Sequence, residues 1–372
     1  MKLTKKELVF FIGTILLMLK TWGAISNYIN FSIYIDKVLL FSSYICYIGS
    51  MFFDKKYTLG ELVKNAIFLG VGIITYYYSK YTDFMTIIVI YISSKNVNMK
   101  KLIKIMFIIN ILLIFLHMAV YIVLIIFNND MIILSRYING KAIYRYSFGF
   151  AHPNTFGTVF FWTIAMYYYL NYELIGTKDY IITFILAIFI YKVPNSRTSA
   201  MALIGMVILM ILTKKNILKY RIVNILYLGV LLICILSIFN IDNKIISFID
   251  KSINNRFTLA YIIYKENSIP LLGQNISGGI STYMNGNYYN NINIIDNSYL
   301  ALLLNYGIIA FIIFNIFMEK LLRHAKNKKE IVFLVIWTFF AISETVCLMP
   351  MIAFPLLWLN NNEVLEKNSI IN

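Results

Sequence analysis

Long runs of apolar residues, separated by short basic or polar connections, extend over most of this chain. Because about 20 apolar residues cross a bilayer as a helix, the pattern predicts about twelve membrane-spanning helices. The expected spans lie near residues 7–25, 35–53, 61–79, 82–94, 102–127, 154–172, 178–194, 196–213, 219–240, 297–318, 329–347 and 350–360. The fourth and the last are short, which is typical of re-entrant or tilted segments.

One polar stretch, Ile241 to Asp296, interrupts this pattern between the expected ninth and tenth spans. It is rich in Asn and Tyr and ends on a carboxylate at the start of a new apolar run. We predict a single transmembrane domain over residues 1–372, with residues 241–296 forming one large external loop. A membrane protein that keeps such a loop is expected to use it for function.

The composition agrees with this fold class, an all-α polytopic integral membrane protein in a lipid bilayer. Hydrophobic residues make up 60% of the chain and charged residues 13%, which excludes an ordinary soluble globular protein. The net charge of +16 comes from basic residues in short connections between spans, so insertion topology explains it and nucleic acid is not expected as a partner. Cys46, Cys234 and Cys347 fall in apolar runs and predict neither a disulfide nor a metal site.

The distribution of Lys and Arg predicts that both termini are cytoplasmic. This orientation places residues 128–151, the connection 192–197 and the large loop on the external side. The candidate motifs therefore face one compartment.

Two of these motifs stand at the expected external starts of spans. His152-Pro153-Asn154 opens the sixth span, where capping would explain the residues and contacts to a polar substrate are the alternative. Asn195-Ser196-Arg197 opens the eighth. A snorkelling arginine would explain Arg197, but hydrogen-bonding side chains at a helix N-terminus also form an anion site.

The large loop supplies two further candidates. Its amides, together with the rings of Tyr288 and Tyr289, suggest contacts to sugars, although a structureless polar loop has the same composition. Asp296-Asn297-Ser298-Tyr299 follows, and Asp296 is either the N-cap of the tenth span or a general base. Arg256 also lies within the loop, where the four basic residues, Arg256 included, balance the four acidic ones.

Taken together, these elements resemble the Wzy-type polymerases of bacterial surface polysaccharide, in the superfamily of O-antigen polymerases and ligases. The resemblance is carried by Phe-Gly-Phe-Ala-His-Pro-Asn at 148–154, Ser-Arg-Thr at 196–198, Arg256 followed by Pro-Leu-Leu-Gly, and Asp-Asn-Ser-Tyr-Leu at 296–300. The order of these short motifs and the span count extend it over most of the chain.

This resemblance implies a membrane glycosyltransferase without cofactor or metal, at the outer face of the bacterial cytoplasmic membrane. It would join polyprenyl-pyrophosphate-linked oligosaccharide repeat units, as donor and acceptor, into capsule, O-antigen or exopolysaccharide with inversion, and a chain-length regulator is an expected partner. Arg197 and Arg256 would bind the pyrophosphate. Asn154, Asn195, Ser196, Asn297, Tyr299, Tyr288 and Tyr289 would contact substrate.

The catalytic base is left open between two residues. In related ligases a His-Asn pair stands where this chain has Asp296-Asn297, which favours the polymerase and Asp296 as base. His152 is the alternative, because its ordinary pKa suits the role. Two other functions are also open: an exporter or flippase for the same lipid-linked oligosaccharides, and an O-antigen-ligase-like glycan transferase.

Overall fold

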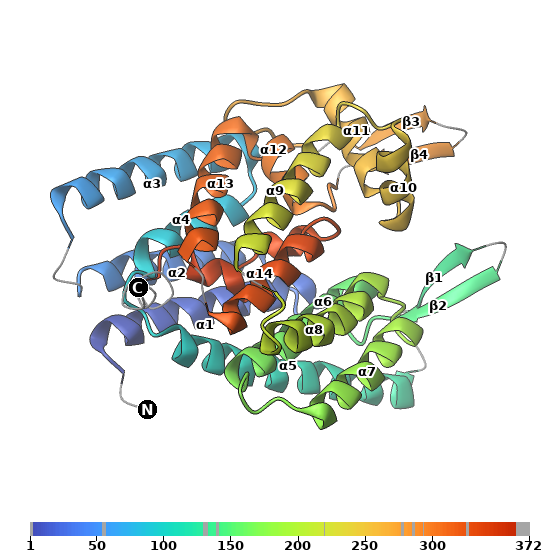
Figure 1. Cartoon of the computed structure of the whole chain (residues 1–372), viewed down its shortest axis with the longest axis horizontal. Coiled ribbons are helices and arrows are strands. Elements are labelled where there is room, and N and C mark those ends of the chain that lie inside the picture. Colours follow the sequence, from blue (N-terminus) through green and yellow to red (C-terminus); the bar gives the residue numbers. More distant parts are fainter. Residues whose placement is uncertain are drawn as a thin grey trace. The chain divides into compact units, whose positions relative to one another are not determined.

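The computed structural model describes residues 3–53, 57–128, 133–138, 141–218, 220–276, 279–284, 287–292, 294–324 and 327–361. Over these residues the chain is mostly helical, with fourteen α-helices and two separate two-stranded antiparallel sheets (Figure 1). The chain divides into two compact units. The first contains Met1–Asp54, Asn96–Leu218 and Lys328–Phe333, and the second contains Lys55–Lys95, Lys219–Asn327 and Leu334–Asn372.

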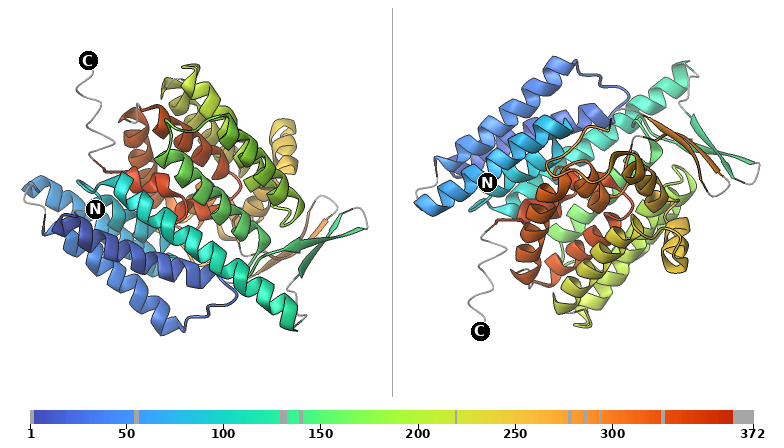
Figure 2. Two further views of the ribbon diagram at one scale, coloured as in Figure 1. Left: turned by 90° about the horizontal axis from the view of Figure 1, so that it is seen from below. Right: turned by 90° about the horizontal axis from the view of Figure 1, so that it is seen from above.

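The first unit is built from six helices and one β-hairpin. They are α1 (Lys5–Ile25), α2 (Ile33–Met51), α5 (Met99–Asn128), β1 (Ile133–Ile138), β2 (Lys141–Tyr146), α6 (Pro153–Leu170), α7 (Thr177–Lys192) and α8 (Arg197–Lys214). Helices α1 and α2 lie side by side (Figure 2), with the rings of Phe10 and Tyr47 in contact and the Tyr47 hydroxyl bonded to Thr14 at 3.2 Å. Thr4 and Glu7 form a capping box that fixes the start of α1.

The second unit contains the remaining elements. They are α3 (Leu59–Ser79), α4 (Asp83–Ser93), α9 (Tyr220–Ser237), α10 (Lys244–Ser252), α11 (Arg256–Asn267), β3 (Ile280–Met284), β4 (Asn287–Ile292), α12 (Ser298–Leu304), α13 (Gly307–His324), most of α14 (Lys328–Phe340), and the 3₁₀ turns η1 (Thr345–Leu348) and η2 (Phe354–Trp358). Every residue of α12 is buried, so this short helix is central to the unit.

The expected tenth span, residues 297–318, is two helices and not one. Helix α12 ends at Leu304 and α13 begins at Gly307, whose φ of +89° belongs to the conformations that favour glycine. Residues 270–274 cover the break: the amides of Ile308 and Ile309 donate to the carbonyls of Pro270 (3.0 Å) and Leu271 (3.2 Å), and Gln274 donates to Asn305 (2.9 Å). These backbone groups at the break are therefore hydrogen-bonded to protein and not to solvent.

Two other expectations, and one alternative left open by the sequence, need correction at the level of local structure. The helix expected over 329–347 ends at Phe340, and the segment expected as a helix over 350–360 is the 3₁₀ turn η2. The polar stretch 241–296 is not structureless, since it contains α10, α11 and the hairpin β3–β4. Asn254 and Asn255 both have φ near +59°, a conformation that Asn adopts more readily than most residues, and they turn the chain between α10 and α11.

Several helices have the length and apolar character of membrane spans. Within the described residues, four helices are long and apolar enough to cross a bilayer: Lys5–Ile25, Leu59–Ser79, Met99–Phe127 and Arg197–Lys214. Shorter apolar helices cover Asp83–Ser93 and Ile222–Ser237. These helices support a membrane protein.

Candidate functional site

The first cluster lies in the first unit and is organised by Arg145, a residue that motif reasoning did not single out. Arg145 is on β2 and only 7% exposed. Its guanidinium donates from Nε to the Pro194 carbonyl (3.2 Å) and from Nη2 to Asn154 Oδ1 (2.5 Å) and the Asn195 carbonyl (3.4 Å). Arg145 thus ties the start of α6 to the connection between α7 and α8.

Arg197 is the first residue of α8 and stands in this same cluster. Its Nε is buried and finds no hydrogen-bond partner among the described residues, and the same holds for Asn195 Oδ1. Ser196 precedes the helix, but its hydroxyl is directed to Ser199 (3.1 Å) and does not cap the free amides of α8. A buried guanidinium nitrogen at an uncapped helix N-terminus is suited to an anion.

Gly157 explains how the two helices approach so closely. A Cβ atom at this position would lie 2.4 Å from Ser196 Oγ, so only glycine lets α6 pack against the start of α8. The Gly157 that follows His152-Pro153-Asn154 in the sequence is therefore part of the geometry that presents Arg197.

His152 is the N-cap of α6, as the capping interpretation predicts. Its Nδ1 accepts a hydrogen bond from the Asn154 amide at 3.1 Å, and Pro153 occupies the first turn. A ring that accepts through Nδ1 carries its proton on Nε2 when it is neutral. His152 is exposed, but its basic nitrogen is used in the cap, so this arrangement does not favour His152 as a catalytic base.

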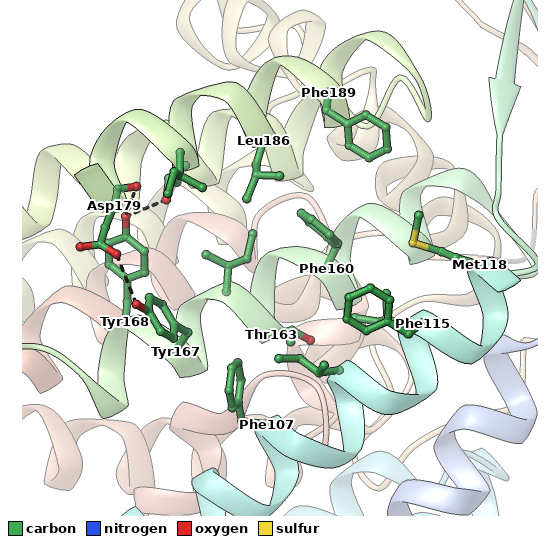
Figure 3. A pocket seen from close by; sticks show the side chains of 15 residues that line it. Phe107, Phe115, Met118, Phe160, Thr163, Tyr167, Tyr168, Asp179, Leu186 and Phe189 are labelled. Carbon is green, nitrogen blue, oxygen red and sulfur yellow. Dashed lines mark hydrogen bonds between the residues drawn. The ribbon is translucent and has the colours of Figure 1, made fainter. Parts of the chain in front are cut away.

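An apolar groove of about 680 Å³ lies between α5, α6 and α7 of the same unit (Figure 3). Phe107, Phe115, Met118, Phe160, Leu186 and Phe189 are among the side chains that line it. Asp179 and Tyr168 mark its polar end, where the Tyr167 hydroxyl donates to Asp179 (3.3 Å) and the Tyr168 and Thr183 hydroxyls are bonded (2.6 Å).

The other end of the groove adjoins the Arg145 cluster. Phe160 and Phe189 line that end, and their rings continue through Phe156 and Phe148 with centroid distances of 4.7–6.5 Å. Phe189 is in the last turn of α7, which is followed directly by the Pro194 and Asn195 carbonyls that bind Arg145. Packed aromatic rings and the end of α7 therefore connect the groove with the Arg145 cluster within this unit.

The second cluster lies in the second unit around Arg256, the first residue of α11. Arg256 is 6% exposed, and its Nη1 donates to the Asp296 carbonyl at 2.9 Å and lies 3.4 Å from Asp296 Oδ2. Its Nη2 contacts Oε1 of the buried Glu344 at 3.2 Å. Arg256 is thus bound to two carboxylates, which makes it a residue that positions Asp296; a direct pyrophosphate contact for Arg256 stays a prediction.

Asp296 does not cap α12, so that alternative from the sequence is wrong. Asn297 is the N-cap and accepts from the Leu300 amide at 2.9 Å, while the Asp296 side chain is 43% exposed. The partly exposed Asp296 carboxylate is thus oriented by a buried guanidinium, and its role as a general base stays a prediction. Glu344, which completes the arrangement, was not anticipated from the sequence.

The other predicted substrate contacts are placed differently. Asn297 is fully buried and donates to the Ile342 carbonyl (2.9 Å), and Tyr299 is 1% exposed with its hydroxyl on the Thr338 carbonyl (3.0 Å). Both side chains hold α12 in place, so their expected substrate contacts have no support from this geometry. Tyr288 and Tyr289 pair with Tyr283 and Thr282 across the β3–β4 hairpin, but their side chains lie outside the described part of the structure.

Asp250 fixes the start of α11 and hence Arg256. The two Asp250 carboxylate oxygens accept from the Phe257 amide (2.7 Å), the Thr258 amide (3.3 Å) and the Thr258 hydroxyl (2.5 Å). Burial raises the pKa of Asp250 above its ordinary value of 3.8, against the opposing effect of these hydrogen bonds. The local fold is therefore expected to respond to pH at this residue.

Asp250→Ala should loosen the start of α11 by about 1–2 kcal/mol, because the helix loses a capping carboxylate. Hydrogen exchange of residues 256–260, corrected for intrinsic rates, measures this change. Since the folded-state pKa is raised, lowering the pH through it should stabilise this segment, and the gain should be complete below about 3.8. Asp250→Asn, which keeps an acceptor but cannot titrate, is the matched control; an unchanged pH response in that variant would contradict the assignment.

No protein-family model, curated protein or solved structure matches this chain. Among the described residues, no three His, Cys, Asp or Glu side chains are grouped closely enough to hold one metal ion.

Proposed function

We propose that this protein is a membrane glycosyltransferase that polymerises polyprenyl-pyrophosphate-linked oligosaccharide repeat units. The observation that carries the proposal is the buried Arg197 Nε, which has no partner among the described residues and stands at the uncapped start of α8. A phosphate oxygen is the acceptor that such a group binds best. Arg145, which binds the Asn195 carbonyl two residues before Arg197, adds a buried positive charge to the same cluster.

The apolar groove supports a lipid-linked substrate. A hydrocarbon chain in the groove between α5, α6 and α7 would place an attached pyrophosphate at the end of the groove that adjoins Arg145 and Arg197. Aromatic and aliphatic walls suit an isoprenoid chain, and burial of apolar surface favours its retention.

In the proposed reaction, the Asp296 carboxylate takes the proton of an acceptor hydroxyl. The resulting oxygen attacks the anomeric carbon of the donor glycan and forms the new glycosidic bond with inversion. The bond between that carbon and the pyrophosphate oxygen breaks, and its electron pair leaves with the lipid pyrophosphate. Within the second unit, Arg256 orients Asp296 and keeps its oxygen directed to the acceptor. Within the first unit, Arg197 is the proposed ligand of a pyrophosphate.

In this proposal the chain crosses the bacterial cytoplasmic membrane several times. The four long apolar helices and the shorter apolar ones support the crossings, and the basic connections support an external position for both clusters.

Reconstitution of the purified protein into vesicles tests the proposal. The substrate is the lipid-pyrophosphate-linked repeat unit extracted from the host cells, and the products are separated by size. A ladder of lengthened glycans is expected. Intact repeat units that have moved across the bilayer would instead identify an exporter, and transfer to a different lipid acceptor without lengthening would identify a ligase-like transferase.

Asp296→Asn should lower the rate of chain extension by about 10²–10⁴-fold, because the general base is lost. His152→Asn should retain most of the activity, since Asn is a good N-cap and preserves α6. Initial rates of ladder formation measure both effects. Glu266→Gln, which removes an exposed carboxylate from the same polar stretch, is the control; the opposite order of effects for Asp296 and His152 would assign the base to His152.

A further inference from the structure

The break between α12 and α13 borders a second cavity, of about 410 Å³, entirely within the second unit. Its polar lining comes from Tyr81, Asp83, Asn275, Asn305, Tyr306 and Thr345, and isoleucine, alanine and leucine side chains cover the rest. Polar and apolar surface are thus mixed, in contrast to the apolar groove of the first unit. This volume is within the range of small-molecule sites, about 300–1,000 Å³.

Several polar groups of this cavity are held in fixed positions. The Tyr306 hydroxyl donates to Asp83 Oδ2 at 3.0 Å, and the Tyr81 hydroxyl is bonded to the Ile276 backbone. Asn305 is the C-cap of α12, and its backbone carbonyl accepts a hydrogen bond from the Gln274 amide. The side-chain Oδ1 of Asn305, however, is buried without a hydrogen-bond partner among the described residues. Because an unpaired buried acceptor is costly, a ligand that brings a donor is expected here.

The chemistry of the lining restricts the ligand. The Asp83 carboxylate disfavours a phosphate or another anion, and the unpaired Asn305 oxygen requires an O–H or N–H donor. The apolar walls suit the C–H face of a ring. A neutral ring that carries several hydroxyl groups, which is a sugar, meets all of these conditions.

Two residues that line the cavity are sequence neighbours of the carboxylates bound to Arg256. Ile295, which lines it, directly precedes Asp296, and Thr345 directly follows Glu344. We propose that this cavity binds the acceptor sugar of the incoming repeat unit and directs its hydroxyl to Asp296. The inference rests on the proposed polymerase function and adds Asn305 and Asp83 as residues that determine acceptor binding.

Asn305→Leu tests the acceptor site by kinetics. With a preformed polymer as donor at fixed concentration and single repeat units varied, the variant should raise the KM for the repeat unit by about 5- to 150-fold, the equivalent of one lost buried hydrogen bond at about 1–3 kcal/mol. Asn240→Leu, at an exposed asparagine, is the matched control. Thermal unfolding in detergent checks that both variants fold. An unchanged KM in folded Asn305→Leu would overturn the inference while leaving the polymerase in place.

Asn275→Cys tests the site without catalysis. Asn275 is exposed at the edge of the cavity, so a cysteine there should react with a maleimide. Labelling of the wild-type protein measures the background reaction of the three native cysteines. The lipid-linked repeat unit should slow this labelling, whereas polyprenyl pyrophosphate without sugar should not. Equal protection by both lipids, or by neither, would overturn the sugar site. Failure of the polymerase proposal is recognised separately, by a wild-type protein that forms no ladder.

Discussion

Replacement of Arg197 by Ala should reduce chain extension by about 10²–10³-fold, the usual effect of removing one preorganised donor to a developing negative charge. The buried Arg197 Nε is already without a partner in the described structure, so its loss should cost the fold little. The rate of ladder formation from lipid-linked repeat units, normalised to the amount of inserted protein, measures the effect. Arg197→Lys should recover only part of the activity, because an ammonium group lacks the planar fork of donors.

Lys192→Ala is the matched control for this prediction. Lys192 is an exposed cation at the end of α7, five residues before Arg197, and it should be dispensable. Equal losses in the two variants would indicate a general effect of surface charge. A normal ladder from Arg197→Ala would remove the anion site and, with it, the main support for the proposed function.

Gly307→Ala should destabilise the second unit by about 3 kcal/mol or more, the sum of backbone strain and overpacking. The φ of +89° disfavours any side chain, and a Cβ atom would lie 2.6 Å from the Gly273 nitrogen and 2.8 Å from the Leu271 carbonyl carbon. These neighbours are backbone atoms of the 270–274 segment, which is hydrogen-bonded across the helix break, so they cannot move aside cheaply. The thermal unfolding temperature in detergent and the yield of inserted protein measure the change.

Gly229→Ala provides the comparison, because Gly229 lies within α9 of the same unit and a Cβ there meets nothing within 4 Å. This variant should be as stable as the wild type or slightly more so, since Ala favours a helix. If Gly307→Ala were equally stable, the break between α12 and α13 would have to be more adaptable than its backbone contacts indicate.

The positions of most helices could be predicted from the sequence because apolar runs of sufficient length admit few other structures in a membrane. His152-Pro153 marks the start of α6 for a local reason, since a cap and a proline need only their neighbours. The break at Gly307 is different. It depends on carbonyl groups of Pro270 and Leu271 more than thirty residues earlier, and hydropathy does not record such contacts.

The candidate site could be predicted only where its residues form short motifs. Asn154 and Arg197 belong to such motifs, but Arg145 joins them through the pairing of β1 with β2 and three hydrogen bonds to distant residues. Glu344 lies within residues 329–347, which the hydropathy pattern predicts as the eleventh span. An acid near the end of an apolar segment was the available signal, because a buried charge needs a partner, and that partner is Arg256.

The backbone bonds across the break also bear on how the chain is made. Ribosomes release residues 270–274 before residues 305–309, so the segment that supplies three of these bonds emerges ahead of the groups that need it. When α12 and α13 enter the membrane, the hydrogen-bond partners of the backbone groups at the break have therefore already been synthesised. We therefore expect the order of these two segments along the chain to limit unpaired backbone groups at the break between α12 and α13 during synthesis.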